Sequence, residues 1–307
     1  MKAIVTGGAG FIGSYITERL LSEGREVTVV DNLTSGKREF LAKMEGSPGF
    51  DLVTIDLLRD DLEGVFDGAE EVYHFAANPD VKLGNEDTSV HFEQNLVVTH
   101  RVLEACRKAG VRKFVFASSS TVYGETDVIP TPEDSRLEPI SLYGASKLAC
   151  ESLISSYAHN YGMRSYVFRL ANVIGGKSTH GVIFDFVRKL KENPEGLEIL
   201  GDGTQNKSYI YIDDCVDAIM FAVAKSGGTF NVFNVGSEDQ TDVKSLARIV
   251  SEELGFHPEF RFTGGDRGWK GDVPKMMLDI SRIKSLGWAP AHTSAEAVRE
   301  TVRTRSF

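Results

Sequence analysis

Short apolar runs alternate with longer helical patterns through the first 170 residues, and this alternation restricts the fold more than any other feature. The apolar runs are KAIVTG, EVTVVD, DLVTID, EVYHFAA, KFVFASS and SYVFRLAN. Helical patterns cover residues 11–22, 37–44, 90–108 and 142–161. Alternating strands and helices form a parallel sheet with helices on both faces, and strands buried on both sides are apolar almost throughout. The sequence therefore predicts an α/β fold with a doubly wound parallel sheet.

After residue 172 the alternation loosens and glycine becomes frequent. The stretches NVIGGKSTHG, ILGDGTQNKS, NVGSEDQ and FTGGDRGWKGD separate helical patterns at 182–191, 213–224, 243–254 and 295–304. We expect two domains, residues 1–172, to which some later segments return, and residues 173–307, a smaller α/β lobe. Ligands of open α/β sheets bind outside the carboxyl ends of the strands, so we expect the loops of the lobe to determine substrate specificity.

Charge and hydropathy exclude several kinds of partner. The formal net charge of -10, from 34 basic and 44 acidic residues, argues against a nucleic-acid partner. No segment is long and apolar enough to span a bilayer, and a strand-like run begins at once, so we expect a cytoplasmic protein without a membrane partner. Cys106, Cys150 and Cys215 lie far apart without a C-x-x-C spacing, which predicts free thiols and no metal site.

A glycine-rich turn joins the first strand to the first helix. VTGGAGFIG places Gly7, Gly10 and Gly13 where glycine permits a tight turn and a close approach of the backbone to a pyrophosphate at the helix N-terminus. Asp31 ends the next strand, near the spacing of about 20 residues expected for the acid that binds adenosine ribose hydroxyls. A carboxylate repels a 2′-phosphate, which favours NAD as the cofactor, while the basic residues 37–38 keep NADP open. These features predict a Rossmann-type dinucleotide-binding domain.

The G-x-x-G-x-x-G form of this turn resembles the extended, nucleotide-sugar-modifying branch of the short-chain dehydrogenase/reductase superfamily. In that family's pattern, residues 56–57 match an adenine-contacting pair, residues 75–77 match a loop beside the cofactor, and Asn95 matches a structural and proton-relay asparagine. Asn78 and Pro79 stand where bacterial relatives often carry a lysine. Besides the glycines and Asp31, the resemblance implies NAD contacts from Phe11, Ile12, Asn32, Ser35, Gly36, Asp56, Leu57, Phe75, Ala76, Ala77 and Asn95.

A serine, a tyrosine and a lysine match the catalytic set of this family. Ser119 lies in FASSSTVYG after the fifth strand, and Tyr143 and Lys147 lie in SLYGASK. Four residues apart on a helix, Tyr143 and Lys147 share one face, with about 6 Å of rise between them. We expect the ammonium of Lys147 and an oxidised nicotinamide to bring the pKa of Tyr143 from about 10 towards neutrality, making it a general base. The resemblance also implies that Tyr143 and Lys147 contact NAD, and Ser119 and Tyr143 the substrate.

Within the branch, the sequence is most similar to the UDP-glucose 4-epimerase family, over SSSTVYG, PISLYGASKLACE, RLANVIG, GDGTQNKSYIYIDD and GWKGDV. This similarity implies NAD-dependent 4-epimerisation of a UDP-hexose, UDP-galactose to UDP-glucose, through a transient 4-keto sugar. It also implies a homodimer formed through the helices at 90–108 and 142–161. Met276 aligns with the gatekeeper for N-acetylated sugars. The expected substrate-binding residues outside the catalytic set are Asn172, Lys207, Tyr211 and Arg267.

Other activities of the branch are alternatives. A 4,6-dehydratase usually carries an Asp-Glu pair after its catalytic threonine, whereas Ser120 and Thr121 stand here, which disfavours dehydration. A UDP-glucuronate decarboxylase or epimerase and a 4-ketosugar reductase remain open. A catalytically silent dinucleotide sensor is an alternative of another class, and the complete Ser-Tyr-Lys set argues against it.

Overall fold

A seven-stranded sheet forms the centre of the first of two compact units in the computed structural model, which describes residues 1–268 and 272–305. This unit comprises Met1–Tyr123, Leu137–Arg169 and Ile219–Phe233. The strand order is β11-β6-β5-β4-β1-β2-β3, and the pairs from β5 to β3 are parallel. The predicted Rossmann-type sheet is confirmed. Its strands are β1 (Lys2–Thr6), β2 (Glu26–Asp31), β3 (Phe50–Thr54), β4 (Glu71–His74), β5 (Lys113–Ser119), β6 (Arg164–Leu170) and β11 (Phe230–Val235).

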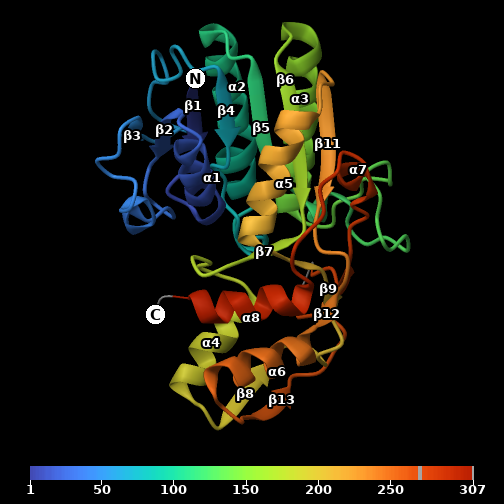
Figure 1. Ribbon diagram of the computed structural model, residues 1–307. Coiled ribbons are helices and arrows are strands. Elements are labelled where there is room, and N and C mark those ends of the chain that lie inside the picture. The colour runs from blue at the N-terminus through green and yellow to red at the C-terminus, as the bar shows by residue number, and fades with distance from the viewer. Residues whose placement is uncertain (269–271, 306–307) are drawn as a thin grey trace. The chain divides into compact units, whose positions relative to one another are not determined.

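Helices cover both faces of this sheet. α2 (Val98–Ala109) and α3 (Leu142–Tyr161) pack against each other on one face, and α1 (Phe11–Ser22) lies on the other (Figure 1). The helices expected at 11–22 and 142–161 are confirmed. The core between sheet and helices includes Val102, Phe114 and Ile154, each fully buried. Cys106, Cys150 and Cys215 are buried free thiols, as predicted.

Two expected helices of the first unit were wrong in part. Residues 37–44 form only the 3-10 turn η1 (Arg38–Leu41), because so short a segment gains too few hydrogen bonds to offset helix nucleation. The helix expected at 90–108 starts at residue 90 as predicted, but its segment Phe92–Val97 forms a six-residue π-helix, η3, before α2 starts. Two further 3-10 turns, η2 (Leu83–Asn85) and η4 (Ser120–Val122), follow β4 and β5. We did not expect the strand β11, which joins the sheet beside β6.

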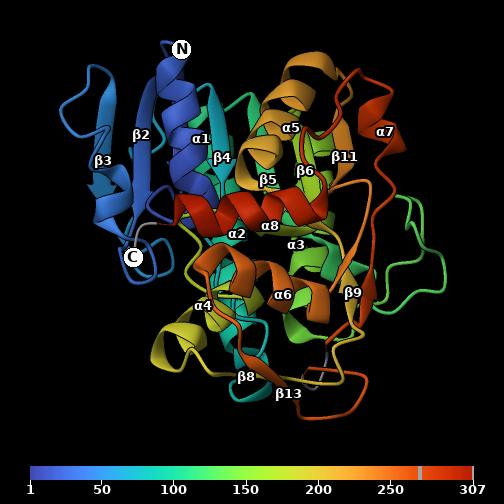
Figure 2. The same ribbon diagram turned by 60° about the horizontal axis from the view of Figure 1, so that its bottom comes forward.

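The second unit consists of small sheets and a group of helices, and comprises Gly124–Arg136, Leu170–Ala218 and Asn234–Phe307. α4 (Val182–Glu192), α6 (Val243–Leu254) and α8 (Ser294–Thr304) pack together (Figure 2). α5 (Ile212–Lys225) runs from this unit into the first, and α7 (Ser281–Lys284) is a single turn. The sheets pair β10 (Tyr209–Tyr211) with β7 (Asn172–Ile174), β13 (Glu259–Phe262) with β8 (Gly196–Ile199), and β9 (Asn206–Lys207) with β12 (Thr241–Asp242) and β14 (Lys275–Met276).

The chain crosses between the units several times. It leaves the first unit after Tyr123 and again after Arg169, and it returns with Leu137 and with Ile219. We did not expect Gly124–Arg136 in the second unit, where Thr131 donates its N–H to the carbonyl oxygen of Met277 at 2.9 Å. Within residues 1–268 and 272–305, no group of His, Cys, Asp or Glu is placed to hold a metal ion, and no helix is long and apolar enough to cross a membrane.

Candidate active site

The glycine turn after β1 is packed so tightly that two of its glycines have no room for a side chain. Gly7 has φ 68°, and a Cβ there would lie 2.5 Å from the backbone nitrogen of Ala76. A Cβ on Gly13 would lie 2.2 Å from the carbonyl oxygen of Gly7. The N-cap of α1 is Gly10, so no capping side chain occupies the first N–H groups of the helix, which include those of the expected contacts Phe11 and Ile12. This turn has the open, positively polarised helix start that binds a pyrophosphate.

Asp31 ends β2 at the same edge of the sheet and is 7% exposed. Its Oδ2 accepts the N–H of Ala9 at 3.0 Å, and its Oδ1 accepts the N–H of Leu33 at 2.8 Å. Burial raises the pKa of Asp31, although both backbone donors oppose the shift. A Cβ on Gly36 would lie 2.7 Å from Oδ1, so glycine is needed there. The remaining two expected contacts of this loop, Asn32 and Ser35, are exposed.

The other expected cofactor residues follow β3 and β4. Asp56 comes two residues after β3 and accepts the N–H of Leu58 at 2.9 Å, while Leu57 is buried. The loop of residues 75–77 packs on the glycine turn, since the N–H of Phe75 donates to the carbonyl oxygen of Thr6 at 3.0 Å. Because β1 to β5 are parallel, these segments all lie at the carboxyl edge of the sheet, as the sequence predicted.

Asn95 joins three elements from within the π-helix η3 and is 1% exposed. Its Oδ1 accepts the N–H of Asn78 at 2.8 Å, and its Nδ2 donates to the Oγ of Ser146 in α3 at 3.0 Å. Nδ2 also lies 3.4 Å from the Nδ1 of His91. π-helical turns occur often at functional sites, and here the turn places a buried amide against the helix that carries Tyr143. Asn95 therefore holds the Asn78 loop to α3.

Ser119 is the last residue of β5 and caps the 3-10 turn η4. Its Oγ accepts the N–H of Thr121 at 3.2 Å and the hydroxyl of Thr121 at 3.0 Å. With two donors on the oxygen, the hydroxyl hydrogen of Ser119 is left to donate elsewhere. Its hydrogen bond with Tyr143 lowers the pKa of that phenol, as a donor to the phenolate does.

Tyr143 and Lys147 lie in the first two turns of α3, which begins after the N-cap Ser141. A Cβ on Gly144 would lie 2.6 Å from the carbonyl oxygen of Thr121, so glycine allows α3 to start directly against η4. This contact brings Tyr143 beside Ser119. The ring of Tyr143 also meets the edge of His91, with centroids 5.5 Å apart.

Lys147 is 4% exposed and reaches back to β5. Its Nζ donates to the carbonyl oxygen of Ala117 at 2.8 Å and lies 4.7 Å from the ring centre of Phe116 and 5.7 Å from that of Tyr143. Burial lowers the pKa of Lys147 to about 8, although Cys150 and Glu151 oppose the shift. Burial raises the pKa of Tyr143 to about 12. The expected fall of the Tyr143 pKa towards neutrality is therefore not a property of the protein groups alone, because burial of the phenol outweighs them.

Two of the four expected substrate residues lie together in the second unit. The Nζ of Lys207 in β9 is 2.5 Å from the Oδ1 of Asp272, which is 6% exposed. Arg267 pairs with Glu125, and its Nη1 also lies 3.4 Å from the carbonyl oxygen of Asp272. Both cations therefore have acidic partners. Trp269, Lys270 and Gly271 of the GWKGDV block lie outside the described residues.

The other two expected substrate residues have different surroundings. Asn172 is half-buried, and its Nδ2 donates to the carbonyl oxygen of Ser208 at 3.1 Å. Tyr211 is buried, its ring lies 5.0 Å from that of His292, and its phenol interacts with Thr304. Asn172 lies in β7 and Tyr211 in β10, which pair with each other, and Ser208 directly follows Lys207 in the chain. The gatekeeper candidate Met276 pairs with Lys207 between β14 and β9.

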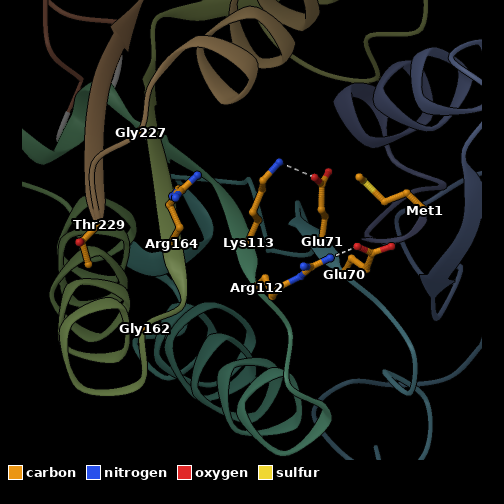
Figure 3. A pocket seen from close by; sticks show the side chains of 9 residues that line it. All are labelled: Met1, Glu70, Glu71, Arg112, Lys113, Gly162, Arg164, Gly227 and Thr229. Carbon is orange, nitrogen blue, oxygen red and sulfur yellow. Dashed lines mark hydrogen bonds and ion pairs between the residues drawn. The ribbon is translucent and has the colours of Figure 1, made fainter.

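A cavity of about 530 Å³ opens at the opposite edge of the sheet, where the strands begin (Figure 3). Glu71 is 2% exposed, accepts a hydrogen bond from Lys113 at 2.7 Å and pairs with Arg25. Burial alone would raise the pKa of Glu71, but its two cationic partners outweigh burial and lower it. None of the predicted site residues lines this cavity. Its walls consist of Met1, Glu70, Glu71, Arg112, Lys113, Gly162, Arg164, Gly227 and Thr229.

Two buried charged residues beside the candidate site were missed by the sequence reasoning. Glu151 and Arg169 pair with each other next to the end of β5. A signal for both was present. Glu151 stands four residues after Lys147 on the same helix face, and Arg169 interrupts an otherwise apolar strand, YVFRL, where a charge requires a partner.

Comparisons with known proteins show which family and which enzymes the chain is similar to. A family model described as the NAD dependent epimerase/dehydratase family matches residues 3–236. A UDP-glucose 4-epimerase of Mycolicibacterium smegmatis is 36% identical over 310 residues, covering 98% of this chain and 97% of its own. A crystal structure of a UDP-galactose 4-epimerase is 45% identical, covers 99% of this chain and 98% of its own, and has a TM-score of 0.89. A UDP-glucuronic acid 4-epimerase from Bacillus cereus, solved with UDP-glucuronic acid and NAD, is 27% identical with a TM-score of 0.91 and covers 99% and 98%.

Proposed function

The chain belongs to the NAD dependent epimerase/dehydratase family, and from this membership we propose that it interconverts UDP-galactose and UDP-glucose at C4. NAD is its cofactor. The observation that carries the proposal is the start of α3 against η4, which sets Tyr143 beside Ser119 with Lys147 one turn further on. The epimerase relatives are similar over almost the whole chain, so the likeness extends beyond the dinucleotide fold.

The residues present fit NAD. The turn has no room for a Cβ at Gly7 or Gly13, and it leaves helix N–H groups for the pyrophosphate. The carboxylate of Asp31 keeps one lone pair on each oxygen beyond its backbone donors, which suits two ribose hydroxyls. When bound, NAD accepts a hydride from C4 of the sugar and returns it, so no net redox change occurs.

The proposed proton chemistry uses the three residues of the catalytic set. Tyr143 takes the proton of the C4 hydroxyl as the 4-keto sugar forms. It returns the proton after the keto sugar has rotated to present its other face. Ser119, whose oxygen is held by Thr121, donates its single hydrogen to the phenolate of Tyr143. Lys147 binds the nicotinamide ribose and stabilises the phenolate by its charge. Burial raises the pKa of Tyr143, and in this proposal the positive charge of oxidised nicotinamide, when bound, would oppose that rise.

The second unit supplies the proposed site for the UDP group. Lys207 and Arg267 are the candidates for the diphosphate, and both now pair with carboxylates, those of Asp272 and Glu125. A bound diphosphate exchanges these intramolecular partners for phosphate oxygens, which charge-assisted hydrogen bonds favour. Asn172 and Tyr211 are proposed substrate contacts by family resemblance.

We also propose a homodimer through α2 and α3, as family resemblance implies. Phe92 is 57% exposed and Leu142 is 43% exposed at the starts of these helical segments. The two segments also line a mostly apolar hollow made by Leu96, Val97, His100, Ala149, Ser152 and Leu153. Light scattering of the purified protein tests the state, and a monomeric mass at micromolar concentration contradicts it.

The proposed function is tested by incubating the purified protein with UDP-galactose and no added reductant. Chromatography of the nucleotide sugars and of the NAD released on denaturation reports the products. UDP-glucose without net NADH supports 4-epimerisation, and a Tyr143→Phe variant that holds NAD without turnover identifies the base. Unchanged sugar with bound NAD contradicts the UDP-hexose proposal and favours an N-acetylated or uronic UDP-sugar.

A 4,6-dehydratase is the less favoured alternative. In that activity an Asp-Glu pair after the catalytic threonine eliminates water, whereas here Ser120 and Thr121 occupy the two positions. Thr121 is engaged in holding the Ser119 oxygen through both its N–H and its hydroxyl. A threonine or serine hydroxyl does not ionise near neutral pH, so it cannot replace a carboxyl group as the acid or base of water elimination.

A further inference from the structure

A buried ion pair connects α3 with β6 in the first unit. Glu151 and Arg169 are each 4% exposed. The Nη2 of Arg169 donates to the Oε2 of Glu151 at 2.7 Å, and its Nε lies 3.1 Å from Oε1 and 3.2 Å from Oε2. A buried pair of this kind seldom gains stability over an apolar pair of the same volume, because both charges lose their hydration. Its presence therefore calls for a reason other than stability.

Glu151 holds the end of β5. The hydroxyl of Ser118 donates to the Oε1 of Glu151 at 2.5 Å, and the Nζ of Lys147 donates to the carbonyl oxygen of Ala117 at 2.8 Å. Glu151 and Lys147 stand one turn apart on α3, so they fix two consecutive residues of the strand. The next residue is Ser119. The position of its hydroxyl relative to α3 therefore depends on these two contacts.

Arg169 holds the segment on the other side of Ser119. Its Nη1 donates to the hydroxyl of Tyr123 at 3.0 Å, and its guanidinium carbon lies 5.0 Å from the centre of that ring. Tyr123 directly follows the turn η4, which Ser119 caps and which contains Thr121. The ion pair thus fixes the chain both before and after Ser119.

We propose that Glu151 and Arg169 are a positioning pair for the proposed reaction. Glu151 keeps the end of β5 in register with α3, and Arg169 keeps both the carboxylate of Glu151 and the segment after η4 in place. Neither residue touches the reacting atoms. The inference rests on the proposed function, since that proposal assigns the reaction to Ser119, Tyr143 and Lys147.

The charge of Glu151 gives the pair a second effect, on Lys147. Burial lowers the pKa of Lys147, and the nearby Cys150 and Glu151 on the same helix oppose that shift. From the neighbouring elements, His74 and His91 also interact electrostatically with Lys147. Replacing Glu151 by an uncharged residue therefore moves the alkaline limit of activity to lower pH. A role confined to folding does not move that limit.

The test compares three variants with the NAD-loaded wild-type enzyme. Ser118→Ala removes the contact of β5 with the carboxylate, and Glu151→Gln keeps an acceptor but removes the charge. Glu151→Leu combined with Arg169→Met replaces the pair by apolar side chains, a change that a merely structural role tolerates. We expect kcat for UDP-galactose to fall about ten-fold or more in the double variant, with KM changed far less, since a displacement of about 1 Å can cost about 100-fold.

Glu71→Gln is the matched control. Glu71 is another buried carboxylate with two cationic partners, at the opposite edge of the same sheet (Figure 3). We expect it to lower the unfolding temperature and leave kcat unchanged. A double variant with wild-type kcat overturns the proposal, whatever its unfolding temperature. If the double variant does not fold, Ser118→Ala and Glu151→Gln decide, and wild-type kcat and pH profile in both overturn it.

A measurement without sugar separates this inference from the proposed function. The ionisation of Tyr143 is followed near 295 nm in NAD-saturated protein, as the difference between each variant and the same variant carrying Tyr143→Phe. Loss of the Ser119 hydrogen bond raises the midpoint, by about half a pH unit or more in Ser118→Ala and none in Glu71→Gln. If the wild type does not convert UDP-galactose, the proposed function fails, yet a raised Tyr143 midpoint in Ser118→Ala still supports the positioning role of Glu151 and Arg169. An unchanged Tyr143 midpoint in Ser118→Ala overturns that role.

Discussion

Replacing Lys147 by methionine is expected to stabilise the protein at neutral pH while abolishing turnover. Lys147 is 4% exposed, and its pKa is lowered from 10.5 to about 8 by burial. At about 1.4 kcal/mol per pH unit, this difference corresponds to roughly 3 kcal/mol of unfolding free energy lost to the buried charge. The variant also loses the hydrogen bond to Ala117, which stabilises the wild type by about 1 kcal/mol. It loses the contact with Phe116, which contributes a similar amount, so the variant is expected to be about 1 kcal/mol more stable than the wild type.

The pH dependence of this effect has a definite sign. The folded-state pKa of Lys147 lies below its unfolded value, so the penalty is complete below pH 8 and vanishes as the pH rises past 10.5. Wild-type stability therefore rises relative to Lys147→Met by roughly 2 kcal/mol between pH 7.5 and 9.5. Other titrating groups contribute equally to both proteins and cancel in the difference.

Urea unfolding of both proteins at pH 7.5, 8.5 and 9.5 measures the difference directly. Lys43→Met, at an exposed position, is the control and is expected to show no such change. A difference between wild type and Lys147→Met that stays constant over this range refutes the reasoning, because it shows that the ammonium carries no burial penalty. Turnover of UDP-galactose measured on the same samples shows whether the stabilised variant is inactive.

Three further perturbations have outcomes fixed by the geometry. Gly144→Ala places a Cβ 2.6 Å from the carbonyl oxygen of Thr121, so kcat should fall by about ten-fold or more with little change in NAD affinity. Gly13→Ala places one 2.2 Å from a backbone oxygen, and calorimetry should show NAD binding weakened by about ten-fold or more. His74 is fully buried with a pKa lowered to about 3 by burial, so stability falls as the pH drops below 6.5. His74→Gln should remove roughly 2 kcal/mol of that loss between pH 6.5 and 5.0 in urea unfolding.

The sheet and the glycine turn could be predicted because their signals are local. Strand runs such as EVTVVD are apolar throughout, and the spacing of Gly7, Gly10 and Gly13 requires a close backbone approach that the structure contains. The helix expected at 142–161 also starts where it was predicted, and the structure shows Ser141 as its N-cap. These features depend on a few neighbouring residues, and a single sequence records them.

The π-helix at residues 92–97 could not be predicted. Its apolar residues fit an α-helix, and the departure follows from the contacts of Asn95 with Asn78 and Ser146, 17 and 51 residues away in sequence. The direction of the Tyr143 pKa shift could not be predicted from the sequence either. The spacing to Lys147 indicates a helpful charge, but the depth of burial determines the direction, and burial depends on the packed fold.

A charged residue in an apolar segment indicated a buried ion pair that we did not predict. Arg169 lies in β6, whose residues after Arg164 are all buried, and a charge there requires a buried partner of opposite sign. The helix patterns offered several acids, and only the packing of α3 on the sheet selects Glu151. Sequence alone therefore indicates that a buried pair exists, and the fold identifies its members.

Buried charge alone does not mark the candidate site, because both edges of the sheet have it. At the amino edge, Glu71 is balanced by Lys113 and Arg25, and these partners hold strand starts that carry no expected catalytic residue. At the carboxyl edge, Glu151 and Arg169 hold the residues on either side of Ser119, and Glu151 also opposes the lowering of the Lys147 pKa by burial. We expect loss of the carboxylate of Glu71 to change stability alone. We expect loss of the carboxylate of Glu151 to change both stability and the groups proposed to move the proton.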